Sequence, residues 1–145
     1  SDEAAQTLLG HAYRAEDYMG YAGRMFAAGV PIVAGTDTWA GFGLHRELEL
    51  YVAAGIPPLH TLRIATWNGA KYTQTLDQRG SIERGKLADL VLLDGDPSVD
   101  ISDIRKASLV IKGGTAYAPA QIFEALGVRP FVPAAPIVSS PSTPD

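Results

Sequence analysis

The sequence predicts an α/β fold of which this chain contains only a part. Residues 17–72 show helical and strand patterns in the order helix, strand, helix, helix, which is the order of a β/α unit. Residues 88–117 show instead a strand that is followed by a hairpin. One β/α unit cannot close a barrel, and so few strands do not make a stable sheet. We therefore expect the chain to be the C-terminal piece of a larger protein.

The first half begins with a predicted helix and a predicted strand. In residues 17–29 the apolar side chains recur at intervals of three and four, and Gly29 is a typical helix stop. Residues 30–36 are apolar and rich in β-branched side chains. This pattern is typical of a strand that is buried on both faces, as in a parallel sheet.

Two further helices are predicted after a glycine-rich turn. Residues 44–55 have one apolar face, and Gly55 ends the helix. The apolar face consists of Leu44, Leu48, Tyr51 and Val52, and we place Arg46, Glu47 and Glu49 opposite to it. Residues 57–72 begin with two prolines, which the first turn of a helix tolerates. The expected core positions of this helix are Leu59, Leu62, Ala65 and Ala70.

The second half is predicted to form strands and one short helix. The predicted strands are residues 88–93, 109–112 and 115–117. Gly113 and Gly114 separate the last two, and a two-residue glycine turn favours a hairpin. Residues 120–126 are compatible with a short helix, and the remaining chain is rich in proline and serine.

The composition excludes several classes of function. The 145 residues include 12 basic and 16 acidic side chains, a net charge of −4, without the basic block that nucleic-acid binding requires. There is no cysteine, which excludes disulfides, thiolate metal ligands and cysteine nucleophiles. No apolar run approaches the roughly 18 residues of a membrane span. The compartment is not indicated by the sequence.

Asp37 is the position that most strongly suggests chemistry. It ends the predicted buried strand, directly after Gly35 and Thr36. A carboxylate at the C-terminal end of a parallel strand lies on the face where α/β barrels place their active sites. The alternative is a structural role, because aspartate commonly starts the turn or helix that follows a strand.

Several motifs resemble, in order and spacing, the C-terminal third of the metal-dependent amidohydrolase superfamily. They include AGTDT at 34–38, LHRELEL at 44–50, NGA at 68–70, GKLADLV at 85–91 and VIKGG at 110–114. The resemblance is to the branch of imidazolonepropionase and prolidase-like enzymes, and it covers residues 17–131. It implies a (β/α)₈ TIM-type barrel with a small β-sandwich that is built from both ends of the chain.

The resemblance also implies a division of this chain into three parts. Residues 1–76 would be the last β/α part of the hydrolase barrel. Residues 77–131 would supply the C-terminal strands of the composite β-sandwich and a short helix. Residues 132–145 would form a tail rich in proline and serine.

The activity implied by the resemblance is hydrolysis of carbon–nitrogen bonds in cyclic amides, amidines or dipeptide-like substrates. A divalent metal, most often zinc, activates water in such enzymes. The residue that matches Asp37 ligates the metal and acts as general base. The family's other ligands lie on strands that precede this chain, and His11, His45 and His60 lack a ligand spacing. We therefore expect the chain alone to be inactive and to bind no metal tightly.

Thr38, Trp39 and His45 are the candidate substrate-binding residues. Thr38 and Trp39 follow Asp37 on the predicted loop, and His45 opens the next predicted helix. The alternatives are that Trp39 is a packed aromatic and that His45 only flanks its helix. His60 and Trp67 are expected to be structural.

The expected partners follow from the same interpretation. They are a small-molecule substrate of the parent protein, and either the rest of the parent chain or a second copy. The alternative function is a non-catalytic module that associates through the unfinished edges of the barrel and the sandwich.

Overall fold

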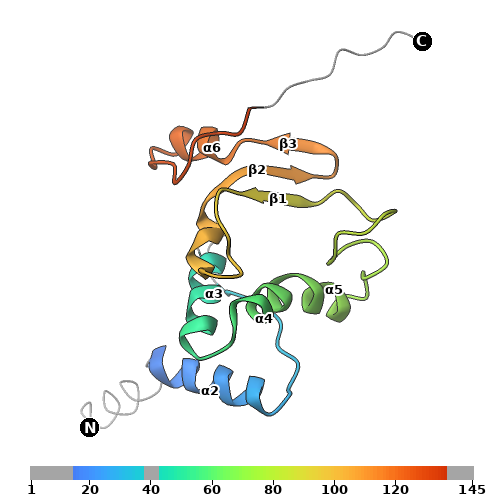
Figure 1. Cartoon of the computed structure of the whole chain (residues 1–145), viewed down its shortest axis with the longest axis vertical. Coiled ribbons are helices and arrows are strands. Elements are labelled where there is room, and N and C mark those ends of the chain that lie inside the picture. The colour runs from blue at the N-terminus through green and yellow to red at the C-terminus, as the bar shows by residue number, and fades with distance from the viewer. Residues whose placement is uncertain (1–14, 38–42, 137–145) are drawn as a thin grey trace, which may run out of the picture. The chain divides into compact units, whose positions relative to one another are not determined.

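The computed structural model describes residues 15–37 and 43–136, which form two compact units (Figure 1). The first unit contains the described residues up to Lys86 together with Asp96–Ser102. The second unit contains Leu87–Gly95 and the described residues from Asp103 onward. The mixture of helices with a small antiparallel sheet agrees with the α/β class that the sequence predicts.

The first unit is helical, and its helices confirm those predicted from periodicity. They are α2 (Ala15–Ala27), α3 (Gly43–Ala53), α4 (Pro58–Arg63), the π-helical segment η1 (Ile64–Asn68) and α5 (Gly69–Tyr72). The last three follow one another without a break, because the residues at both junctions keep right-handed helical angles. The predicted helix at 57–72 therefore exists, with a π-helical turn in its middle. No helix among the described residues has the length and apolar character that a membrane crossing requires.

Gly55 terminates α3 in the manner that its sequence position predicts. Its φ is 89°, a left-handed angle that costs a residue with a side chain considerable strain. The amide of Gly55 donates to the carbonyl of Val52, and the amide of Ile56 donates to that of Tyr51. This pair of bonds is the Schellman motif, in which the residue after the glycine commonly packs on the helix. Ile56 is accordingly buried.

The prediction of a strand at residues 30–36 is wrong, because these residues form no strand in the described part of the chain. The segment is extended but belongs to no sheet, and Val30 and Val33 are 42% and 38% exposed. The physical reason is that a strand needs a second backbone beside it. None of the described residues supplies that backbone, so the segment has alternating exposed and half-buried residues without a ladder.

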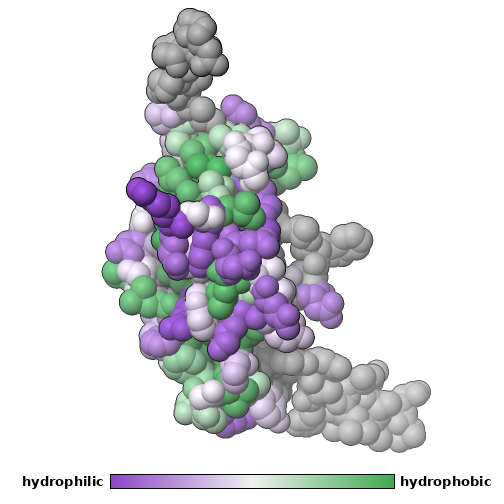
Figure 2. All heavy atoms as spheres, turned by 90° about the vertical axis from the view of Figure 1, so that its right-hand side faces the viewer, coloured by the Kyte–Doolittle hydropathy of each residue, from purple (hydrophilic) through white to green (hydrophobic). Residues whose placement is uncertain are grey.

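The core of the first unit lies where the helices pack against one another. Helix α3 packs on both α2 and α4. The buried residues of this unit are Leu48, Ile56, Thr61, Ile64, Ala70 and Ile101. Leu59, an expected core position, is instead 65% exposed, because the helix turns Thr61 and Ile64 inward. Figure 2 shows several separate hydrophobic patches between hydrophilic ones on one face of the molecule.

The second unit contains an antiparallel sheet in the order β1-β2-β3. The strands are β1 (Leu90–Leu93), β2 (Ala107–Lys112) and β3 (Thr115–Tyr117), which confirms the three predicted strands. Leu90 lies opposite Ile111, and the register shifts between Leu92 and Leu93. Helix α6 (Pro119–Ala125) packs against β2. This is the one sheet within the described ranges, and it lacks the second layer that a sandwich requires.

Two further features connect the elements of the second half. A 3₁₀ turn, η2 (Ile101–Arg105), precedes β2. The carboxylate of Asp89, just before β1, accepts bonds from the Lys112 ammonium at 2.6 Å and from the Gly113 amide at 2.9 Å. Asp89 therefore ties the β2–β3 turn to the start of β1.

The β2–β3 turn provides a test of the local backbone. Gly113 and Gly114 have φ of 56° and 79°, and a Cβ on Gly113 would meet no atom within 4 Å. We expect Gly113→Ala to destabilise the fold by about 1 kcal/mol, through backbone strain alone. Gly113→Asn should cost clearly less, because asparagine tolerates the left-handed region. Chemical unfolding of the three proteins measures this, and equal losses for Ala and Asn would contradict the turn geometry.

Candidate active site around Asp37

Asp37 is the last described residue of the extended segment and has a left-handed backbone. Its φ is 47°, and within the described ranges Gln74 is the one other non-glycine residue with a positive φ. Aspartate adopts this conformation more readily than most residues, although at a cost in strain. Strain of this kind is found preferentially at functional sites. The residue as a whole is exposed.

Of the other predicted site residues, only His45 lies within the described ranges. Thr38 and Trp39 lie outside the described residues. His45 lies in the first turn of α3 and is half-buried. Among the described residues, no hydrogen bond or ion pair joins Asp37 to His45. The structure therefore places His45 on the helix that follows Asp37 in the chain.

Two helix side chains hold the extended segment that leads to Asp37. Oε1 of Glu47, on α3, accepts a hydrogen bond of 2.9 Å from the amide of Gly35. The amide nitrogen Nδ2 of Asn68, in η1, donates a bond of 2.7 Å to the carbonyl oxygen of Ile32. Backbone groups that would pair with a neighbouring strand in a sheet are thus satisfied here by polar side chains.

Sequence reasoning missed the role of Glu47. We placed it on the polar face of its helix, together with Arg46 and Glu49. Glu47 lies three residues after Leu44 and four before Tyr51, a spacing that puts all three on one face of a helix. A carboxylate within an apolar stripe is the signal that could have identified it.

Tyr51 completes the contact at Glu47. Its hydroxyl donates a bond of 2.6 Å to the same Oε1 atom that receives the Gly35 amide. The second oxygen of Glu47, Oε2, is buried and has no hydrogen-bond partner among the described residues. Burial raises the pKa of Tyr51 above its ordinary value of 10.0, and the hydrogen bond and negative charge of Glu47 raise it further. The hydroxyl therefore stays protonated and can donate at neutral pH.

A cavity of about 640 Å³ lies beside this contact in the first unit. Helix α2, the extended segment and α3 line it, mainly with apolar side chains. Glu47, Tyr51 and Thr36 are among its polar lining residues. This volume is in the range of small-molecule pockets. The cavity thus adjoins the backbone that leads into Asp37.

A second cavity, of about 880 Å³, lies at the other end of the extended segment. Residues from Phe26 to Val33 and residues of α4, η1 and α5 line it. The ring of His60 lies edge-on to that of Phe26, with ring centroids 5.3 Å apart. The guanidinium of Arg63 lies over the ring of Trp67, 4.2 Å from the ring centroid. These contacts support packing roles for His60 and Trp67, and the cavity does not include Asp37.

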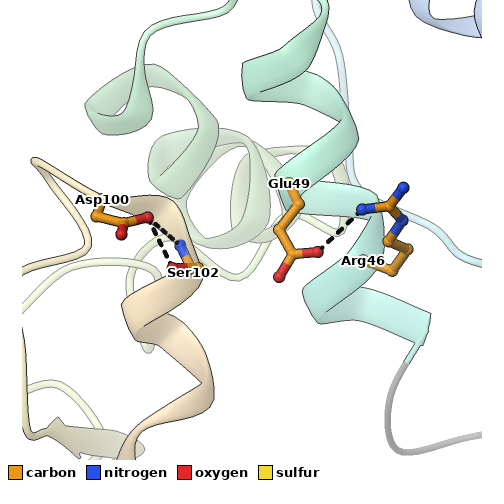
Figure 3. A network of polar contacts seen from close by, with 4 residues as sticks. All are labelled: Arg46, Glu49, Asp100 and Ser102. Atoms are coloured by element: carbon orange, nitrogen blue, oxygen red, sulfur yellow. Dashed lines mark hydrogen bonds and ion pairs between the residues drawn. The ribbon is translucent and has the colours of Figure 1, made fainter.

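Figure 3 shows two further polar contacts of the first unit. Arg46 and Glu49 form an ion pair of 3.3 Å on the surface of α3, and exposed pairs of this kind contribute little. Oδ1 of Asp100 accepts bonds from the amide and the hydroxyl of Ser102, the second residue of η2. The described residues contain no cluster of three or more histidine, aspartate or glutamate side chains that could hold a metal ion.

Comparison with known proteins identifies the class to which this fold and this residue pattern belong. The model of the amidohydrolase family matches residues 13–121, and the chain therefore belongs to the amidohydrolase family. The match includes the extended segment, Asp37, the helices that hold them and the three-stranded sheet.

Individual relatives agree with this assignment. Adenine deaminase 2 of Jannaschia sp. is 32% identical over 85 residues, which cover 58% of this chain and 14% of the relative. Imidazolonepropionase of Pyrobaculum arsenaticum is 43% identical over 70 residues, which cover 45% of this chain and 17% of the relative. The crystal structure of a Xaa-Pro dipeptidase with bound methionine matches with a TM-score of 0.66 and 35% identity, over 69% of this chain and 25% of that chain. The chain thus spans about a quarter or less of the length of these proteins.

The shifted pKa of Tyr51 leads to a test. Because the pKa in the folded state is raised above that of an unfolded tyrosine, about 10, Tyr51 contributes stability that is present below pH 10 or so. That contribution is lost as the pH rises toward the folded pKa. We expect Tyr51→Phe to make the alkaline loss of stability shallower, as measured by unfolding at a series of pH values. Tyr72→Phe, at an exposed tyrosine, is the matched control, and identical curves for both variants would contradict the assignment.

Proposed function

We propose that this chain is part of a hydrolase that acts on carbon–nitrogen bonds of small molecules. Membership of the amidohydrolase family supports this proposal. The relatives named deaminase, imidazolonepropionase and Xaa-Pro dipeptidase support it further, since those names describe reactions at carbon–nitrogen bonds. Cyclic amides, amidines and dipeptides are the corresponding substrate classes. The proposal concerns the whole protein, of which the described residues would form the C-terminal part of a barrel and of a sandwich.

The observation that carries the proposal is the placement of Asp37. Asp37 ends an extended segment that lies within the residues matched by the family model. The residue is exposed, and its backbone has a strained, left-handed φ. We assign to Asp37 the role of general base, which accepts a proton from the attacking water and passes it to the leaving nitrogen. Thr38, Trp39 and His45 stay candidates for substrate contacts.

The described residues alone do not make a metal site. Amidohydrolases generally use divalent metals, and a catalytic zinc takes about three protein ligands. No group of three suitable side chains exists within the described ranges, and Asp37 offers one carboxylate. We therefore propose zinc for the whole protein only, with Asp37 as one ligand and the others supplied from outside this chain. When bound, such a metal lowers the pKa of its water.

The extended segment also supports a proposal on partners. Residues 30–36 have apolar side chains and no strand beside them among the described residues. Val30 and Val33 are exposed, as are Val91 and Leu92 of β1 in the second unit. We propose that strands from the rest of the protein, or from a second copy, cover these residues.

The role of Asp37 can be tested in the full-length natural protein. We expect Asp37→Asn to lower turnover by at least about 10²–10⁴-fold, because an amide cannot accept the proton. Asparagine also tolerates the left-handed backbone, so the variant removes the carboxylate without adding strain. The assay follows product release from adenine, imidazolonepropionate and Xaa-Pro dipeptides.

Asp77→Asn provides the matched control, since it removes the same charge from another exposed aspartate of the first unit. It should leave turnover within about twofold, as substitutions of exposed residues away from a site usually do. Near-normal turnover by Asp37→Asn would show that Asp37 only shapes the turn.

Metal analysis gives a second test, which does not need a substrate. We expect the purified 145-residue chain to hold well below one zinc ion per chain after dialysis, because one carboxylate binds metal weakly. The full-length protein should hold at least one, and Asp37→Asn should reduce that content. If the 145-residue chain held one zinc ion per chain and lost it in Asp37→Asn, the proposal that the other ligands come from outside this chain would be wrong.

A further inference from the structure

We propose that Glu47 is a positioning residue that, together with Tyr51, fixes the backbone on which Asp37 is presented. The proposal rests on the assignment of Asp37 as the general base. It adds a second residue, on a different element, on which the reaction would depend without touching the substrate.

Two hydrogen bonds at Glu47 connect helix α3 to the extended segment before Asp37. Tyr51 lies one helical turn after Glu47, and its hydroxyl donates to Oε1 at 2.6 Å. The same oxygen accepts the Gly35 amide at 2.9 Å. Bonds to a carboxylate are about twice as strong as bonds between neutral groups. Tyr51 fixes the rotamer of Glu47, and Glu47 fixes the amide of Gly35.

The location of this contact explains why it would affect catalysis. Gly35 precedes Asp37 by two residues, or about 7 Å of extended chain. No strand among the described residues lies beside this stretch, and the bond from Glu47 restrains it two residues before Asp37. Misplacing a reacting group by about 1 Å can cost about 10²-fold in rate.

Asn68 provides an internal comparison. It holds the same segment through the carbonyl of Ile32, at 2.7 Å. Ile32 precedes Asp37 by five residues, or about 17 Å of extended chain. Loss of this bond should therefore loosen the segment without displacing Asp37 to the same degree. Comparing variants of Glu47 and Asn68 therefore distinguishes a general role in holding the segment from a specific role in positioning Asp37.

The experiment compares three variants with the wild type of the full-length natural protein. Glu47→Leu removes the acceptor and should lower kcat by about 10- to 100-fold while KM stays within about threefold. Glu47→Gln keeps an oxygen acceptor and should restore kcat to within about fivefold of the wild type. Asn68→Leu should destabilise the protein comparably while kcat stays within about threefold. Activity is measured on the member of the substrate panel that the wild type turns over.

A readout without substrate accompanies the kinetics. Amide hydrogen exchange of Gly35, in the same proteins, should be at least about tenfold faster in Glu47→Leu than in the wild type and near the wild-type rate in Glu47→Gln. If Glu47→Leu does not fold, Tyr51→Phe removes a single hydroxyl and should shift kcat and Gly35 exchange in the same directions by smaller amounts.

The outcomes separate this proposal from the function that it rests on. If Asp37→Asn is inactive while Glu47→Leu has the wild-type kcat, or if Asn68→Leu lowers kcat as much as Glu47→Leu, the positioning role is overturned and the function stands. If Asp37→Asn turns over normally, the assignment of Asp37 as general base and the positioning role of Glu47 are both overturned, and if the wild type turns over no member of the panel, the proposed function itself fails. A fall in kcat confined to Glu47→Leu and Tyr51→Phe, with faster Gly35 exchange and rescue by Gln, supports the proposal.

Discussion

The candidate site depends on the hydrogen bond between the carboxylate of Glu47 and the amide of Gly35. An extended segment without strand partners has backbone groups that need other partners, because an unpaired buried amide or carbonyl costs about 1–3 kcal/mol. Here two helix side chains, Glu47 and Asn68, satisfy such groups at two points of the segment. In the described part of the chain, side chains on the helices therefore hold the extended segment that leads to Asp37.

This arrangement makes the position of Asp37 a consequence of helix packing. Glu47 and Asn68 reach the segment only because α3 and the helix at Pro58–Tyr72 are fixed relative to each other. Leu48, Ile56 and Ile64 are buried where these helices meet, and their burial contributes about 1.5–3 kcal/mol for each side chain. A loss of packing in this core would therefore move the two anchors, and with them the backbone at Asp37.

Local signals were sufficient to predict most elements of the fold. Gly55 ends α3 and the pair Gly113-Gly114 turns the hairpin, because in both places the backbone needs angles that glycine adopts without strain. The extended segment at 30–36 could not be predicted in the same way. Whether such a segment is a strand depends on a neighbouring backbone far away in the sequence, and apolar β-branched residues carry no information on whether that neighbour is present.

The candidate site shows the same limit. Asp37 stays a prediction, which rests on its position after a recognisable segment and on its match to a family motif. The contact of Glu47 with Gly35 joins residues that are 12 positions apart, and no local rule predicts it. The helical spacing of Leu44, Glu47 and Tyr51 does put the carboxylate on the apolar face, where it needs a donor. Tyr51 supplies one donor, and a backbone amide is the most abundant source of a second.

The choice of a carboxylate at position 47 has a physical reason. One oxygen atom of Glu47 accepts two bonds, one from a phenol and one from an amide. A negatively charged oxygen supports both donors well, since charge-assisted bonds are shorter and stronger than neutral ones. The carboxylate therefore holds the Gly35 amide and the Tyr51 hydroxyl at one point, which an apolar side chain at position 47 could not do.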